Sequence, residues 1–261
     1  MSKVPRRPLR GLIVDVDGTL TDRDRVLNLD AARALRTLSN RGFPVVLATG
    51  NVLPISLGLH RFIGLKGPII ADNGGLVYFD ENRIVRLARR EIALQAFEKL
   101  RETLPVRPLF TDRWRETEVA LVPDLPVAEI ATRVKGMGVR VESTGFAIHL
   151  FEPTAGKLPA ARIALEPYGI GVEDCLVAGD GDNDVALMQA ASVSVTFPEA
   201  MPRARATADY ITTRGDGEGF LEALTHFGLL LSGEGSFRPS RSPGTRVHSA
   251  RKRKKGGSPD P

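Results

Sequence analysis

The first candidates for chemistry are two carboxylates that follow an apolar run. Asp15 and Asp17 belong to a D-x-D-G-T segment that comes directly after the apolar residues 9–14. In open parallel sheets, ligands bind beyond the carboxyl ends of the strands. Two carboxylates at positions i and i+2 there can serve one site, where one attacks a substrate and the other transfers protons. A simple Asp-Gly turn is the alternative, but a full D-x-D-G-T is expected by chance in only about a few chains per thousand.

A second acidic group lies in the sequence GDGDND at residues 179–184, after an apolar run and before a helical pattern. Several carboxylates crowded at one strand end repel each other unless a cation is present. Hard oxygen ligands of this kind suit Mg²⁺, which keeps several waters and binds substrate phosphate. The segment therefore predicts a magnesium site, and a solvated acidic turn is the alternative.

Two weaker signals gain meaning beside these. Thr49, Gly50 and Asn51 end an apolar run and open a helical pattern, so a hydroxyl and free backbone N–H groups can form a phosphate cradle. By itself the segment favours a helix cap, with Asn51 as the N-cap and Pro54 in the first turn. Lys157 stands at the start of another helical pattern, where an ordinary exposed lysine is the alternative.

The elements that must position these residues alternate between strand and helix. Residues 9–79 and 157–231 show apolar strands separated by helical patterns, which predicts an α/β fold with a Rossmann-like parallel sheet covered by helices. Residues 79–153 contain two helices and strands that lie closer together. This middle part predicts a small α+β unit inserted into the parallel domain.

Local patterns predict the shape of two segments near the site. The spacing of Leu158, Ala161, Leu165 and Tyr168 predicts that they line one helix face. The Asn-Gly-Gly sequence at 73–75 lies between two apolar runs and predicts a hairpin turn.

The composition is that of a globular protein with one large or two modest domains. The 261 residues are 42% apolar and 26% charged. No apolar run reaches the 18 residues that a membrane span needs. The single cysteine, Cys175, excludes an internal disulfide, and we interpret it as packed core. A cytoplasmic location follows as the default expectation.

The net charge of +5 comes from one end of the chain. Residues 232–261 carry eight Lys and Arg against two Asp and Glu, whereas the remaining 231 residues carry 28 basic and 29 acidic side chains. The end segment is rich in Ser, Gly, Pro and Arg and predicts a disordered basic tail. The basic run 251–255 could contact nucleic-acid phosphates, and a simple solvated tail is at least as well supported. The balanced body favours no nucleic-acid partner.

The ordered set of motifs resembles the haloacid dehalogenase superfamily in residue type, order and context. The middle unit resembles the second-position cap of that superfamily. The resemblance implies a catalytic core at 1–79 plus 155–231, a cap at 80–154 and the tail at 232–261. The motifs that carry it are Asp15-x-Asp17-Gly18-Thr19, Thr49-Gly50-Asn51, Lys157 and Gly179-Asp180-x-x-Asn183-Asp184.

The resemblance also implies roles. Asp15 would attack phosphorus and form an aspartyl-phosphate, and Asp17 would protonate the leaving oxygen and then activate water. The implied substrate-binding residues are Thr49, Gly50, Asn51 and Lys157. The implied Mg²⁺ ligands are Asp15, the backbone carbonyl of Asp17, Asp180 and Asp184.

The substrate is expected to be a small phosphorylated metabolite. The segment 143–149 resembles the archaeal-type phosphoglycolate phosphatases, which implies hydrolysis of 2-phosphoglycolate. A sugar-phosphate phosphatase or a phosphosugar mutase of the same fold is the alternative. A substrate carboxylate would need a cation, and Arg113, Arg115 and Arg140 are the candidates. We interpret His149 as a structural histidine rather than a substrate contact.

Overall fold

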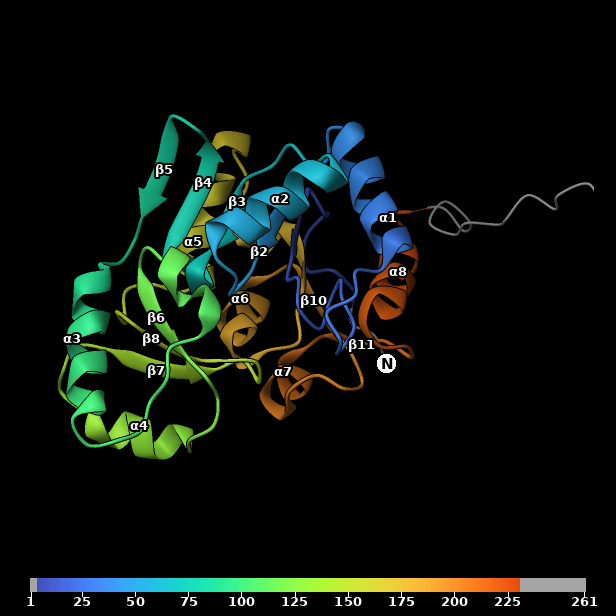
Figure 1. The fold of residues 1–261 in the computed structure, drawn as a ribbon. Helices are drawn as coiled ribbons and strands as arrows, with labels where there is room; N and C mark the ends of the chain where they lie inside the picture. The colour runs from blue at the N-terminus through green and yellow to red at the C-terminus, as the bar shows by residue number, and fades with distance from the viewer. Residues whose placement is uncertain (1–3, 231–261) are drawn as a thin grey trace, which may run out of the picture.

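The computed structural model describes residues 4–230, which form a large sheet and a small sheet, each with its own helices (Figure 1). The basic tail at 232–261, with its predicted disorder and nucleic-acid contact, lies outside the described residues. Within residues 4–230, no helix is long and apolar enough to cross a membrane. The cytoplasmic location stays a prediction.

The large sheet has eight strands, and six of them are parallel. Strands β4 and β5 add an antiparallel edge. In sheet order the strands are β11 (Tyr210–Ile211), β10 (Val193–Thr196), β9 (Cys175–Ala178), β1 (Gly11–Val14), β2 (Val45–Ala48), β3 (Ile69–Ala71), β4 (Leu76–Asp80) and β5 (Arg83–Arg86). This arrangement, with helices on both faces, confirms the predicted fold class.

Side chains of the central strand alternate between the two faces of the sheet, as the pleat requires. Leu12 and Val14 pack in the core formed with α1, α8 and the end of α2, whereas Ile13 packs in the core formed with α5, α6 and α7. The helices on the first face are α1 (Leu29–Asn40), α2 (Leu53–Ile63) and α8 (Asp216–His226). Those on the second are α5 (Lys157–Leu165), α6 (Val185–Ala190) and α7 (Pro202–Thr207).

The small sheet is antiparallel and has the strand order β6-β8-β7. Its strands are β6 (Glu118–Leu121), β8 (Ile148–Phe151) and β7 (Arg140–Ser143). Val119 and Leu150 pack against helices α3 (Arg90–Arg101) and α4 (Val127–Arg133). Because strand side chains alternate, Glu118 and His149 point to the opposite face. That face carries these two polar side chains together with Ala120 and Phe151, and α3 and α4 pack on the other face.

The predicted hairpin turn at 73–75 is confirmed. The short 3₁₀ segment Asp72–Gly74 joins β3 to its antiparallel partner β4. Asn73 has φ 52° and Gly74 has φ 90°, which are left-handed values that Asn and Gly accept most readily. A Cβ atom on Gly74 would lie 2.1 Å from the carbonyl carbon of Gly156, so the turn also meets the start of α5.

The predicted helix face of α5 holds for Leu158, Ala161 and Leu165, which pack on one core, and is wrong for Tyr168. The buried residues are Ala160, Ala161, Ala164 and Leu165, while Leu158 is only partly buried. Tyr168 lies beyond the end of the helix, because α5 ends at Leu165 and a 3₁₀ turn follows. The small alanines allow the helix to pack closely on the sheet, and the helix is too short for the four-position pattern. Cys175, predicted as packed core, is buried in β9.

Candidate active site

Three of the predicted carboxylates follow neighbouring strands. Asp15 and Asp17 come directly after β1, and Asp180 comes after β9, with Val14 beside Ala178 in the parallel register. The backbone N–H of Asp15 donates to the Ala178 carbonyl at 2.9 Å. The parallel pairing therefore brings residues that are far apart in sequence to one edge of the sheet.

Gly18 allows the loop after β1 to meet the loop after β9. Its φ of +71° is in the left-handed region, and a Cβ atom there would lie 2.3 Å from Oδ2 of Asp180. Real Cβ atoms do not approach an oxygen this closely, so the position requires glycine for both its backbone and its space.

The carboxylates of Asp15, Asp180 and Asp184 form a cluster that fits a divalent cation. Each offers an oxygen, and these atoms lie within 4.8 Å of one another. Burial raises the pKa of Asp15 well above its ordinary value, and the nearby carboxylates of Asp184, Asp180 and Asp17 raise it further. Burial and the Asp184 carboxylate raise the pKa of Asp180 to about 7. Three crowded hard-oxygen donors that repel each other are the donor set that Mg²⁺ prefers.

Lys157 is the buried cation of the site. It is the first residue of α5 and is only 2% exposed. Its Nζ lies 3.0 Å from Oδ1 of Asp15 and 2.7 Å from Oδ1 of Asp184. Burial alone would lower the pKa of Lys157, but the two carboxylates raise it above its ordinary value. The alternative of an ordinary exposed lysine is therefore wrong.

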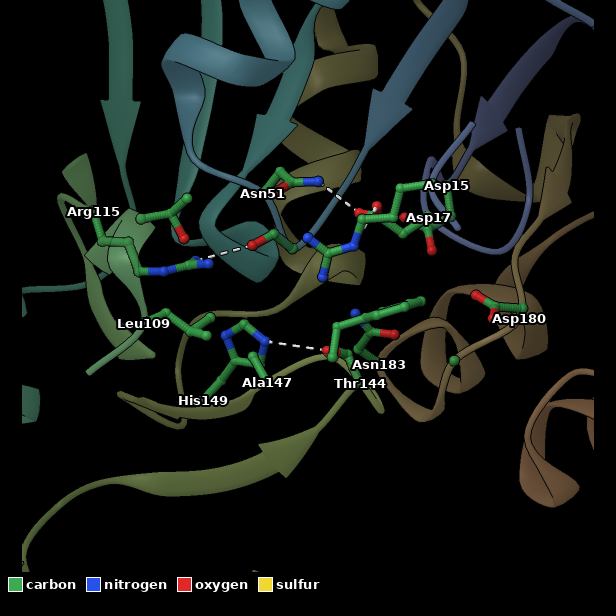
Figure 2. A pocket seen from close by; sticks show the side chains of 15 residues that line it. Asp15, Asp17, Asn51, Leu109, Arg115, Thr144, Ala147, His149, Asp180 and Asn183 are labelled. Atoms are coloured by element: carbon green, nitrogen blue, oxygen red, sulfur yellow. Dashed lines mark hydrogen bonds and ion pairs between the residues drawn. The ribbon is translucent and has the colours of Figure 1, made fainter. Parts of the chain in front are cut away.

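Asp17 lies beside the cluster and is held by Asn51. The Asn51 side-chain amide donates to Oδ2 of Asp17 at 2.5 Å (Figure 2). Arg25 Nε lies 3.8 Å from Oδ1 of Asp17. Burial raises the pKa of Asp17, although Arg25, Lys157 and the Asn51 hydrogen bond act in the opposite direction. A carboxyl group with a raised pKa can carry and return a proton.

The prediction that Asn51 caps a helix is wrong. Helix α2 begins at Leu53, and its N-cap residue is Val52, which makes no side-chain cap hydrogen bond. The Asn51 backbone N–H instead donates to the Thr49 hydroxyl oxygen at 3.0 Å. Its side chain is thereby available for Asp17. Pro54 does lie in the first turn, as predicted.

A small cavity of about 50 Å³ opens in front of Asp15, between the carboxyl edge of the large sheet and the small sheet (Figure 2). The predicted site residues that line it are Asp15, Asp17, Gly50, Asn51 and Asp180. The other three, Thr49, Lys157 and Asp184, are almost fully buried behind them. The small sheet and its loops contribute Leu109, Thr111, Arg115, Thr144, Phe146, Ala147 and His149.

Sequence reasoning missed a buried polar network between the two sheets. Asn183 Nδ2 donates to Oδ1 of Asn73 at 2.9 Å, and Asn73 Nδ2 donates to Oε2 of Glu118 at 3.1 Å. Glu118 Oε2 also lies 3.1 Å from Nδ1 of His149. The only signal in the sequence was a charged residue in the alternating pattern of β6. That pattern does not indicate that the Glu118 face of β6 is buried against the large sheet.

The three candidate arginines have different surroundings. Arg113 stacks on the exposed rings of Phe110 and Trp114. Arg140 pairs with Glu142 at 3.0 Å. Neither is among the residues that line the cavity, whereas Arg115 lines it and is 5% exposed. His149 is buried, as expected of a structural histidine, but it also lines the cavity.

Comparison with known proteins agrees with this geometry. The sequence profile of the haloacid dehalogenase-like hydrolases matches residues 12–109 and 127–224. The chain belongs to this family.

The chain matches two relatives over almost the whole length of each. A phosphoglycolate phosphatase of Methanothermobacter thermautotrophicus is 38% identical over 84% of this chain and 99% of the relative. A phosphoglycolate phosphatase of Methanopyrus kandleri is 37% identical over 80% of this chain and 92% of the relative.

Solved structures of the family share the fold. A Thermoplasma acidophilum protein superposes with a TM-score of 0.79 at 28% identity, covering 86% of this chain and all of the other. A haloacid dehalogenase subclass IIB sugar phosphatase superposes with a TM-score of 0.70 at 17% identity, covering 85% of this chain and all of the other. At this identity the second likeness concerns the fold alone.

Proposed function

We propose that this hydrolase is a magnesium-dependent phosphatase that cleaves a small phosphate monoester through an aspartyl-phosphate on Asp15. The observation that carries the proposal is the position of Asp15 in the cavity, with Lys157 Nζ 3.0 Å behind it and Asp17 beside it. Burial raises the pKa of Asp15, whereas Lys157 acts in the opposite direction, and a bound cation would further favour the anionic, nucleophilic form.

The reaction has two balanced steps. First, a carboxylate oxygen of Asp15 attacks phosphorus, the bond from phosphorus to the leaving oxygen breaks, and that oxygen takes the proton of Asp17. Second, water attacks phosphorus, Asp17 takes the proton of the water, and the bond to Asp15 breaks. Phosphate leaves and both carboxyl groups return to their first state.

The residues around Asp15 and Asp17 support these steps. The Asn51 amide holds Asp17 in one orientation at the cavity wall. Backbone N–H groups near Gly50 and the Thr49 hydroxyl are proposed to hold phosphoryl oxygens. Thr49 is fully buried, so its hydroxyl would act from beneath the loop.

The proposed metal ligands are Asp15, Asp180, Asp184 and the backbone carbonyl of Asp17. A bound Mg²⁺ would offset the negative charge of the phosphoryl group beside these carboxylates. Removal of the metal by EDTA is therefore expected to stop turnover, and added Mg²⁺ is expected to restore it.

We propose 2-phosphoglycolate as the substrate. The support is the name of the relatives at 37–38% identity and the small cavity, which favours a short leaving group.

We also propose residues 1–79 with 155–231 as the core and 80–154 as a cap. Strand β5 lies within the proposed cap range 80–154, but it pairs with β4 of the large sheet.

The test compares kcat/KM for 2-phosphoglycolate, glycerol phosphates, hexose phosphates and p-nitrophenyl phosphate in the presence of Mg²⁺. The proposal predicts the highest value for 2-phosphoglycolate. If a hexose phosphate is faster by about tenfold, which corresponds to 1.4 kcal/mol in transition-state binding, a sugar-phosphate phosphatase replaces this proposal. Analysis of product isomers separates a phosphosugar mutase from both.

A further inference from the structure

The two walls of the cavity carry opposite kinds of side chain. Asp15, Asp17 and Asp180 lie on one side, and Arg115 and His149 lie on the other (Figure 2). A substrate whose phosphoryl group lies against Asp15 must therefore direct its leaving group toward Arg115 and His149.

A fully buried carboxylate organises the second wall. Glu118 is 0% exposed, forms an ion pair with NH1 of Arg115, and lies 3.1 Å from Nδ1 of His149. Burial by itself would raise the pKa of Glu118, but Arg115 and His149 lower it below its ordinary value. A buried carboxylate is tolerated only with such partners, so Glu118 fixes both side chains in place.

The contact with Glu118 decides which ring nitrogen of His149 serves the cavity. A carboxylate accepts hydrogen bonds, so Nδ1 carries the proton that points at Glu118. Nε2 is then directed to the other side, where it lies 3.3 Å from the Thr144 hydroxyl (Figure 2). In its protonated form, His149 donates from Nε2 as well, and it adds one positive charge to the Arg115–Glu118 pair.

Arg115 has a donor that the protein does not use. Its NH1 group donates to Glu118 and to the Gly50 carbonyl at 2.9 Å, and it lies 3.6 Å from Oδ1 of Asp72. Its Nε is buried and has no hydrogen-bond partner within residues 4–230. A buried N–H without a partner is unfavourable, and a ligand oxygen would satisfy it.

We infer that Arg115, His149 and Thr144 form a subsite for a carboxylate on the leaving group, and that Glu118 is the positioning residue of this subsite. The inference rests on the proposed phosphatase function and names the substrate class: phosphate monoesters with a carboxylate one carbon away from the ester oxygen. A carboxylate can accept from the Arg115 guanidinium, from the Thr144 hydroxyl and, when the imidazole carries both protons, from Nε2 of His149.

Arg25 is the other cation at the cavity, and its surroundings differ. Its side chain is 53% exposed, lies 3.8 Å from Asp17 and stacks on the ring of Phe146. These contacts assign it to the acid–base side of the cavity rather than to the subsite.

The test is a specificity ratio. It compares kcat/KM for 2-phosphoglycolate with kcat/KM for 2-hydroxyethyl phosphate, which has nearly the same shape and no carboxylate. The variants are Arg115→Gln, His149→Gln and Thr144→Val, with Arg25→Gln for the other cation at the cavity. The matched control is Arg113→Gln from the same segment as Arg115. Thr144 is only partly buried, so Thr144→Val keeps the test valid if the buried substitutions unfold the protein.

The inference predicts that the wild type and Arg113→Gln prefer 2-phosphoglycolate by about thirtyfold or more. The ratio should fall by about tenfold in Arg115→Gln and His149→Gln and by a smaller factor in Thr144→Val, mainly through KM. The inference is overturned if the wild type shows no preference, if folded variants keep the ratio, or if only Arg25→Gln lowers it. If the wild type hydrolyses neither ester with Mg²⁺, the proposed function itself has failed.

Discussion

At the scale of single residues, the site depends on a buried balance of charge. Lys157 lies between Asp15 and Asp184 and is almost without solvent contact. Removing one partner from a buried ion pair leaves an uncompensated charge, which costs far more than losing a surface pair. Lys157 therefore contributes to the stability of the fold as well as to the proposed catalysis.

Lys157→Ala should lower the free energy of unfolding by about 3 kcal/mol in EDTA at pH 7. Added Mg²⁺ should restore part of this loss, because a cation among the carboxylates replaces the missing charge. The measurement is urea denaturation with and without Mg²⁺. Lys99→Ala, which removes an exposed lysine paired with Glu102, should change the value by less than about 1 kcal/mol. A loss no larger than that of the control would contradict this account of Lys157.

Substitutions of Asp17 and Asp180 should have separate effects on catalysis and on metal binding. Asp17→Asn should slow hydrolysis strongly but keep its affinity for Mg²⁺, because only the backbone carbonyl of Asp17 is proposed as a ligand. Asp180→Asn should lose affinity, since its carboxylate belongs to the acidic cluster. Calorimetric titration of Mg²⁺ into both variants gives the comparison. Equal losses of affinity would reject this division of roles.

At the scale of elements, the loop after β1 depends on a glycine. Gly18→Ala should reduce turnover by about tenfold or more, because the new methyl group would displace the Asp180 carboxylate. Gly42→Ala is the matched control: its φ is +80°, and nothing lies within 4 Å of a Cβ atom there. Both variants should lose about 1 kcal/mol of stability from the left-handed backbone, but only Gly18→Ala should lose activity. Equal kcat values in the two variants would contradict the proposed clash.

The grouping of site residues at the strand ends was predictable, because short apolar strands separated by helices indicate a parallel sheet. The sequence therefore indicated that Asp15 and Asp180 would lie close together, and the register of β1 and β9 agrees. Details that depend on short contacts were not predictable. Helix α2 begins at Leu53 rather than after Asn51, and α5 packs mainly with its alanines and Leu165.

At the scale of the whole molecule, the network between the sheets was beyond sequence reasoning. Glu118, Asn73 and Asn183 are separated by up to 110 residues and meet only because the small sheet folds back on the carboxyl edge of the large one. Nothing in a local pattern gives the position of one unit relative to another. His149 showed this limit: its alternating strand indicated burial but not the cavity beside it.

We expect Asp72 to make the junction between the two units sensitive to pH. It lies at the turn after β3, and its Oδ2 accepts from the backbone N–H of Glu116 at 2.8 Å, in the segment before β6. Burial, together with the Glu118 carboxylate, raises the pKa of Asp72 from 3.8 to about 7, although Arg115 acts in the opposite direction. A carboxyl group with a raised pKa in the folded state stabilises the fold below its unfolded pKa, and this contribution is lost as the pH rises to about 7.

Asp72→Asn should remove this pH dependence. The unfolding free energy of the variant, relative to that of the wild type, should rise by on the order of 2 kcal/mol as the pH rises from 4 to 8. Denaturation curves at several pH values across this range measure it. If this relative free energy stays constant or falls as the pH rises, Asp72 does not have the raised pKa on which the prediction depends.

The central claim is that Asp15 receives the phosphoryl group, and one measurement tests it most directly. Phosphate release from 2-phosphoglycolate with Mg²⁺ is measured for the wild type, for Asp15→Asn and for the exposed control Asp24→Asn. The account predicts that Asp24→Asn resembles the wild type and that folded Asp15→Asn falls below about one thousandth of its rate, because an amide cannot replace the anionic nucleophile. A folded Asp15→Asn protein, free of contaminating phosphatase, that keeps a rate within about tenfold of the wild type would contradict the account.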